Sequence, residues 1–140
     1  MSTEFVNPSD PEIRALLERT RTVAVVGLSP RPERASHAIA AYLIQSGYRV
    51  LGVRPGFREI LGCPCYESLG EVPEKIDLVD VFRRSEFVSG HVDEAIAAGA
   101  SALWLQIGVV DRRAALSARE AGLDVVMDRC ILVEHRRLLR

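Results

Sequence analysis

One stretch near the N-terminus, residues 22–36, constrains the fold of this chain most strongly. Thr22 to Val26 is a short uncharged run rich in valine, which predicts a buried strand, and Gly27 follows it directly. The chain then turns and reaches Ser36, where a helical pattern begins. Because unpaired N–H groups and the positive end of the helix dipole meet at such a helix start, the stretch predicts a site for an anionic phosphate.

The remainder of the chain repeats this alternation of strand and helix. Four further strands are expected over residues 48–53, 76–82, 102–107 and 123–127. Helices are expected over residues 9–17, 36–46, 87–98, 111–120 and 128–139. Such βαβ units have right-handed crossovers, so we predict an α/β fold: one Rossmann-like, doubly wound domain over residues 1–140 with a mainly parallel sheet of about five strands. Residues 57–66 are expected to be irregular and residues 1–8 flexible.

The charge balance and the cysteine content narrow the functional class. The 140 residues carry a formal net charge of −1, and 26% are charged, which argues against nucleic-acid and membrane-surface binding. The sequence has no signal-like start and no long apolar run, so we expect a cytoplasmic protein. Cys63, Cys65 and Cys130 are too few for a disulfide framework, and reduced thiols are expected in that compartment.

Arginines follow several of the expected strands, at the edge where open α/β sheets bind their ligands. They are Arg31, Arg34, Arg54, Arg58, Arg83, Arg84 and Arg129. Because arginine binds phosphate bidentately, several at one edge indicate a multiply phosphorylated ligand. The alternative is a solvated arginine-rich surface. The helix start at the same edge favours the ligand.

The turn after the first strand distinguishes between nucleotides. A nicotinamide site is expected to have Gly-x-Gly-x-x-Gly here and an acid after the second strand. The sequence instead reads Gly27-Leu-Ser-Pro-Arg-Pro, and the second strand ends in Val53-Arg54-Pro55, so NAD is disfavoured. Arg54 suits a ribose phosphate, which both NADP and coenzyme A carry. There is no Walker A loop, which excludes a P-loop ATPase.

Several stretches together resemble the coenzyme A-binding family related to the N-terminal domain of the succinyl-coenzyme A synthetase α subunit, and its stand-alone members most of all. The matching stretches cover nearly the whole chain in order: Val25-Val-Gly-Leu-Ser-Pro30, Ser36, Gly47-Tyr-Arg-Val50, Val53-Arg-Pro55, residues 62–69, Asp77 to Arg84, Trp104-Leu-Gln-Ile-Gly108 and Met127-Asp-Arg-Cys130. The resemblance implies that coenzyme A or an acyl-coenzyme A lies across the carboxyl edge of the sheet.

The residues at the carboxyl edge and the resemblance together predict a set of binding residues. They are Gly27, Leu28, Ser29, Pro30, Arg34, Ser36, His37, Val53, Arg54, Pro55, Arg58, Phe82, Arg83, Gln106, Ile107 and Gly108. Arg54 departs from the family, which often has asparagine there. The chain ends just after Cys130, where the phosphohistidine domain of the synthetases would begin, so we expect binding without self-contained catalysis and assign no catalytic residue.

Two alternatives to a coenzyme-binding protein stay open. One is an enzyme, either an NADP-dependent reductase or an acyl-transfer component that a partner protein completes. The other is a regulatory protein whose cysteines respond to the thiol or disulfide form of the coenzyme. Zinc bound by Cys63, Cys65, Cys130 and His135 is disfavoured by the narrow Cys-x-Cys spacing.

The remaining polar candidates have simpler expected roles. His37 lies at the helix start and is close enough to contact a phosphate, whereas His91 and His135 are expected in solvent. Ser36 and Asp128 are expected to cap the helices that follow them. Trp104 and Phe82 are expected in the core or in the cleft wall.

Overall fold

The computed structural model describes residues 4–139 and is an α/β domain built on one sheet. The sheet has seven strands in the order β3-β4-β2-β1-β5-β6-β7. The strands are β1 (Thr22–Val26), β2 (Arg49–Val53), β3 (Glu59–Ile60), β4 (Cys63–Tyr66), β5 (Leu78–Val81), β6 (Ala102–Leu105) and β7 (Asp124–Met127). All neighbouring pairs are parallel except β3 with β4. The expected Rossmann-like fold class is confirmed.

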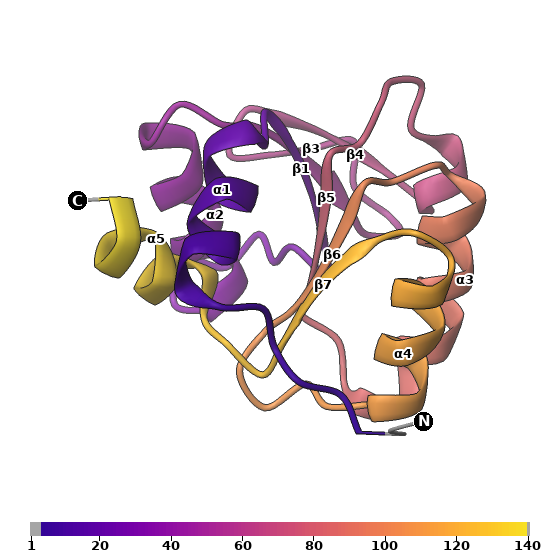
Figure 1. The fold of residues 1–140 in the computed structure, drawn as a ribbon. Helices are drawn as coiled ribbons and strands as arrows, with labels where there is room; N and C mark the ends of the chain where they lie inside the picture. Colours follow the sequence, from indigo (N-terminus) through magenta and orange to yellow (C-terminus); the bar gives the residue numbers. More distant parts are fainter. Residues whose placement is uncertain (1–3, 140) are drawn as a thin grey trace.

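Helices cover both faces of this sheet (Figure 1). They are α1 (Asp10–Arg19), α2 (Ala35–Gln45), α3 (Val88–Ala97), α4 (Arg112–Glu120) and α5 (Ile131–Leu139), and two short 3-10 helices span Leu69–Glu71 and Ser85–Phe87. One apolar cluster joins the sheet to α1, α2 and α5, and a second joins it to α3 and α4. Because both faces are buried, the central strands are continuous apolar runs, which is why the sequence reveals them.

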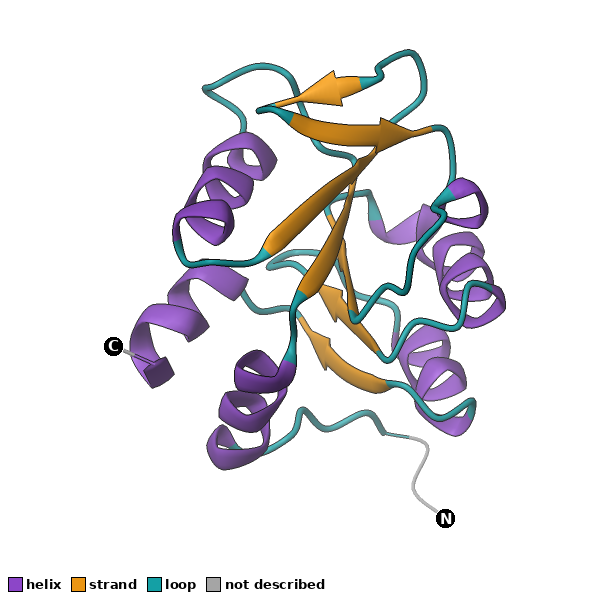
Figure 2. Ribbon diagram, turned by 90° about the horizontal axis from the view of Figure 1, so that it is seen from above, coloured by secondary structure: helices purple, strands orange, loops and turns teal. Residues whose placement is uncertain are grey.

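The segment over residues 57–66 is not irregular, and this expectation is wrong. It forms the hairpin of β3 and β4, with Leu61 and Gly62 in the turn at φ values of 57° and 73°. β4 then pairs with β2, where Gly52 lies opposite Cys65. A Cβ atom on Gly52 would lie 2.6 Å from the Cys65 sulfur, so the missing side chain lets β4 approach. The hairpin extends the sheet beyond β2 (Figure 2).

Two helices begin at a capping side chain, at the starts expected over residues 9–17 and 111–120. The Ser9 side chain and Glu12 make a capping box at the start of α1. The Asp111 carboxylate accepts the Ala114 N–H at 3.0 Å at the start of α4.

Two other expected caps are wrong. Ser36 lies inside α2, where its hydroxyl oxygen accepts the Ser29 N–H at 2.9 Å. Asp128 accepts the Gly108 N–H at 2.7 Å, and the first N–H of α5, from Ile131, is satisfied by the Gln106 side chain at 3.1 Å. The Ser36 side chain thus joins α2 to the loop after β1, and the Asp128 side chain joins the loops that follow β6 and β7.

The expected solvent exposure of two histidines is also wrong. His135 is buried because α5 packs against α1 and α2, and its Nδ1 lies 2.6 Å from the Tyr42 hydroxyl. The His91 side chain is half-buried beside Glu94, with 3.4 Å between Nδ1 and Oε1, and burial lowers the pKa of His91.

The chain before α1 is attached to the edge of the sheet. The flexibility expected for residues 1–8 falls partly on residues 1–3, which lie outside the described residues. From there on, the Asn7 side chain pairs with the Met127 backbone: it donates to the carbonyl at 2.9 Å and accepts the N–H at 2.8 Å. The Arg119 guanidinium carbon lies 4.3 Å from the centre of the Phe5 ring. This segment therefore covers the edge strand β7.

We expect Asn7→Ala to lower the free energy of unfolding by roughly 1–3 kcal/mol, because two hydrogen bonds are lost. Val6→Ala is the matched control, since that neighbouring side chain is 68% exposed. Urea denaturation measures both variants. Equal stabilities would show that the pairing contributes nothing.

Candidate functional site

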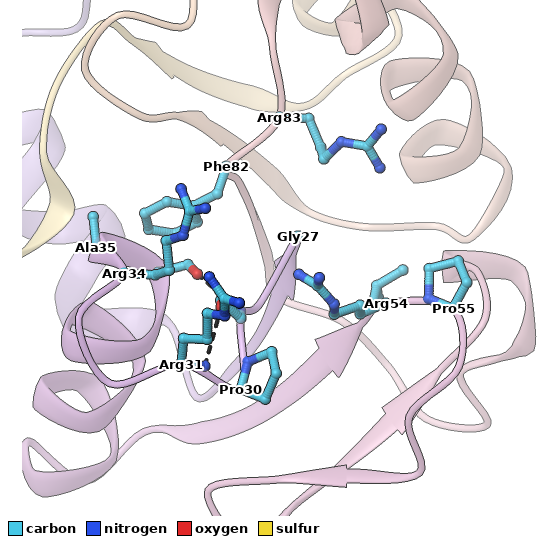
Figure 3. Close-up of a pocket in the computed structure, with 12 residues that line it drawn as sticks. Gly27, Pro30, Arg31, Arg34, Ala35, Arg54, Pro55, Phe82 and Arg83 are labelled. Carbon is cyan, nitrogen blue, oxygen red and sulfur yellow. Dashed lines mark hydrogen bonds between the residues drawn. The ribbon is translucent and has the colours of Figure 1, made fainter.

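The candidate site is a cavity of about 760 Å³ at the carboxyl edge of the sheet (Figure 3). β1 leads into α2 on one face, whereas its neighbour β5 leads into α3 on the other. A crevice opens where adjacent strands send their connections to opposite faces, and ligands bind there in open α/β sheets. The cavity is lined by Gly27, Ser29, Pro30, Arg31, Arg34, Ala35, Ser36, Val53, Arg54, Pro55, Phe82 and Arg83.

Gly27 forms the floor where β1 turns toward α2. Its φ is +88°, and a Cβ atom there would lie 3.1 Å from both the Phe82 carbonyl oxygen and Cδ of Arg83. The position therefore needs glycine for its backbone conformation and because the segment that directly follows β5 lies so close to it.

We expect Gly27→Ala to destabilise the fold by roughly 1–3 kcal/mol more than Gly56→Ala does, because only the first substitution adds overpacking. The control is matched, since Gly56 has the same φ of +88° and nothing within 4 Å of the added Cβ. Thermal and urea denaturation measure the difference. A Gly56→Ala effect as large as that of Gly27→Ala would assign the cost to backbone strain alone.

The cavity is strongly positive. Its lining contains four arginines, Arg31, Arg34, Arg54 and Arg83, and no acid. None of the four forms an ion pair within residues 4–139. Figure 3 shows the side chains of Arg31, Arg34 and Arg54 around the hollow. An uncompensated group of guanidinium groups is a strong attraction for a polyanion.

Aromatic rings and one carbonyl hold two of these arginines. The Arg54 guanidinium carbon lies 5.4 Å from the centre of the Phe57 ring, and its Nη1 donates to the Leu28 carbonyl at 3.4 Å. The Arg83 guanidinium carbon lies 4.8 Å from the centre of the Phe87 ring. These contacts orient the side chains while leaving their remaining N–H groups for a ligand.

Neutral donors line the same cavity. α2 begins at Ala35, so the N–H groups of Ala35 and Ser36 have no partner within the helix. Ser29 and Ser36 are buried and line the cavity, and each hydroxyl oxygen already accepts a backbone N–H. Their hydroxyl protons are therefore directed away from those N–H groups, and an anionic oxygen can accept them.

Ten of the sixteen residues expected from the sequence line this cavity: Gly27, Ser29, Pro30, Arg34, Ser36, Val53, Arg54, Pro55, Phe82 and Arg83. Two lining residues were not among the expected sixteen. Arg31 could have been found, because it belongs to the arginines that follow β1. Ala35 contributes a backbone N–H, and no side-chain signal marks it.

The other six expected residues do not line the cavity. Leu28 is fully buried in the core, and Gln106 is buried against the start of α5. The remaining four are His37, which bonds to the Ser29 carbonyl, Arg58 on the exposed loop before β3, and Ile107 and Gly108 in the loop after β6. Ile107 is 69% exposed. The loop after β6 thus lies beyond the cavity, at the same edge of the sheet.

None of the three cysteines lines this cavity. Cys63 and Cys65 are buried in β4, and burial raises the pKa of both thiols, which disfavours the reactive thiolate. Within residues 4–139 no three histidine, cysteine or acidic side chains come close enough to hold a metal ion. The zinc arrangement of Cys63, Cys65, Cys130 and His135 is therefore not formed. No helix in residues 4–139 has the length and apolar character needed to cross a membrane.

Comparison with known proteins assigns the chain to a family. The family described as CoA binding domain matches residues 21–136, which include every residue that lines the cavity. The chain belongs to the CoA binding domain family. The resemblance noted from the sequence motifs is thereby confirmed.

Members of comparable size are similar over nearly their full length. The uncharacterized protein YneT of Bacillus subtilis (strain 168) is 42% identical over 129 residues, which are 92% of this chain and 96% of YneT. A hypothetical protein from Pyrococcus horikoshii OT3 has a solved structure with a TM-score of 0.90 and 38% identity, covering 100% of both chains. Both proteins are therefore close to this chain in length.

A much larger protein contains a similar segment. Acetate–CoA ligase [ADP-forming] I of Archaeoglobus fulgidus is 29% identical over 121 residues, which are 79% of this chain and 18% of the ligase. The match thus leaves most of the ligase without a counterpart in this chain.

Proposed function

We propose that this protein binds coenzyme A, or an acyl derivative of it, in the cavity at the carboxyl edge, and that it carries out no reaction by itself. The observation that carries the proposal is the group of four uncompensated arginines in a cavity at the start of α2, in a member of the CoA binding domain family. Coenzyme A has a 3′-phosphate and a 5′-diphosphate on its adenosine half, so it presents several anionic groups within a short distance.

The dimensions and lining of the cavity support this ligand. Its volume of about 760 Å³ falls within the range of roughly 300–1,000 Å³ that is usual for sites of small molecules and cofactors. The end of β2 supplies Arg54 where a nicotinamide site has an acid for the ribose hydroxyls. Arg54 is therefore assigned to the phosphorylated ribose, and the start of α2 to the diphosphate.

The lining also supports the absence of self-contained catalysis. It contains no histidine, cysteine, lysine or acid, so no side chain there is suited to act as a general base or as an activated nucleophile. Ser29 and Ser36 have hydroxyl groups, but their described partners are backbone N–H groups. A bound thioester would then be held without being cleaved.

One alternative rests on the ligase match. A segment similar to this chain forms 18% of a larger acetate–CoA ligase, so the protein could supply the coenzyme site of an acyl-transfer system whose chemistry lies on another chain. Release of free thiol from acetyl-coenzyme A by the purified protein alone would contradict the absence of catalysis. Release only after a partner is added would favour this alternative.

The test of the proposal is calorimetric titration with coenzyme A, acetyl-coenzyme A, coenzyme A disulfide and NADP in parallel. We expect saturable binding of the coenzyme A forms and none of NADP. Binding of NADP alone would favour a reductase. The absence of a binding signal with every form of coenzyme A would refute the proposal.

A further inference from the structure

Ser29, in the loop between β1 and α2, is held on three sides. Its N–H donates to Oγ of Ser36 at 2.9 Å, and its own Oγ accepts the Arg31 N–H at 3.1 Å. Its carbonyl oxygen lies 2.9 Å from Nδ1 of His37. Two successive side chains in the first turn of α2 therefore hold the two backbone groups of one loop residue.

The carbonyl contact determines which nitrogen of the His37 ring carries a proton. A backbone carbonyl oxygen only accepts hydrogen bonds, so Nδ1 must be the donor. In the neutral ring Nε2 then has the lone pair. His37 itself does not line the cavity, whereas Ser29, Arg31 and Ser36 do.

We propose that His37 is a positioning residue of the coenzyme site, acting through the Ser29 carbonyl. This inference rests on the proposed function. With the carbonyl held by His37 and the N–H by Ser36, the loop has a fixed distance from the start of α2. The Ser29 and Ser36 hydroxyl protons and the first N–H groups of the helix then face one anionic group together. Without the Nδ1 donor, the loop loses one of the two hydrogen bonds that join Ser29 to α2. The loop must then be ordered when the ligand binds, which lowers the affinity.

Three substitutions separate positioning from direct contact with the ligand. His37→Asn keeps a donor at the position of Nδ1, His37→Gln places its donor at the position of Nε2, and His37→Leu has none. We expect His37→Asn to bind coenzyme A like the wild type. We expect His37→Gln and His37→Leu to bind about tenfold more weakly, which equals 1.4 kcal/mol. Thermal denaturation of each variant confirms that it is folded before calorimetry.

The opposite pattern overturns the proposal. If His37→Gln binds like the wild type and His37→Asn does not, Nε2 contacts the ligand directly. Equal affinity of the wild type and the three variants for coenzyme A would show that the hydrogen bond to the Ser29 carbonyl does not affect binding.

A measurement without ligand keeps this inference separate from the proposed function. Nitrogen-15 NMR of the wild-type imidazole is expected to show the proton on Nδ1 in the neutral ring. A neutral ring protonated only on Nε2 would contradict the hydrogen bond from Nδ1 to the Ser29 carbonyl. Failure of the wild type to bind coenzyme A, with the proton on Nδ1, would refute the proposed function and leave His37 without a role in a coenzyme site.

Discussion

Arg34→Ala combined with Arg54→Ala is expected to weaken coenzyme A binding by at least about a hundredfold. Each substitution removes a charged donor, and a hydrogen bond to a charged group contributes roughly 1.5–3 kcal/mol. The two losses add if the arginines contact different phosphates. They enter the cavity from the start of α2 and from the end of β2. Calorimetric titration of the double variant and of each single variant measures the effect.

Arg58→Ala is the matched control for this prediction. Arg58 belongs to the same arginine-rich edge in the sequence, but it lies on an exposed loop and does not line the cavity. We expect its removal to leave the affinity unchanged. An equal loss of affinity in Arg54→Ala and Arg58→Ala would indicate general attraction by positive charge instead of a built site.

Asp80→Asn is expected to stabilise the protein increasingly as the pH rises. The Asp80 carboxyl is fully buried in β5, and neither oxygen has a hydrogen-bond partner among the described residues. Burial raises the pKa of this carboxyl well above its ordinary value of 3.8. Its cross-strand neighbours are Val25 and Trp104, which offer it no compensating charge.

The sign of the pH dependence follows from proton binding. Above the ordinary value of 3.8, the unfolded chain releases this proton while the folded chain keeps it. The wild type should therefore lose up to about 1.36 kcal/mol of stability per pH unit between that value and the pKa of the folded state. Asparagine is uncharged throughout, so the variant does not have this dependence.

Thermal denaturation at about pH 5 and about pH 8 measures the difference between wild type and Asp80→Asn. The gap in melting temperature should be wider at the higher pH. Asp93→Asn is the control, because Asp93 is exposed on α3 and its substitution should produce no such widening. A gap that is constant with pH would mean that the Asp80 carboxyl is ionised in the folded protein.

The sequence predicts the fold well where local signals and burial agree. The run from Thr22 to Val26, followed by Gly27, marks both β1 and the floor of the cavity. The capping residues Ser9 and Asp111 mark the starts of α1 and α4. For the two caps the deciding hydrogen bond is formed three residues away, and for β1 the burial of both sheet faces makes the whole strand apolar.

The expectations that are wrong concern residues whose deciding contacts are made with residues distant along the chain. β4 forms because Cys65 packs on Gly52 in another strand, and a Cys-Pro-Cys run has no period that predicts it. Asp128 has the residue type of a helix cap but bonds to Gly108, twenty residues away. His135 is buried because α5 folds back onto α1 and α2. Such contacts depend on the packing of the finished fold.

The candidate site shows the same division. Residues that directly follow β1, β2 and β5 line the cavity as expected. His37 and Arg58 have side chains suited to an anionic ligand, but neither lines the cavity. The His37 ring contacts the Ser29 carbonyl, and the Arg58 carbonyl accepts the Cys65 N–H of β4. Residue type and strand ends therefore locate the site, whereas the contacts of each side chain decide which residues enter it.

Coenzyme A binding in the arginine-lined cavity is tested most directly by recording the backbone amide NMR spectrum of the protein during titration with coenzyme A. We expect the largest shifts at the amides of Gly27, Ser29, Arg31 and residues 34–36, together with Val53 and Arg54. Asp124 begins β7 and lies at the amino edge of the sheet, opposite the cavity, so the amides around it should not shift. Saturable shifts confined to the first group would support coenzyme A binding in the arginine-lined cavity. An unchanged spectrum, or shifts centred on another part of the surface, would contradict it.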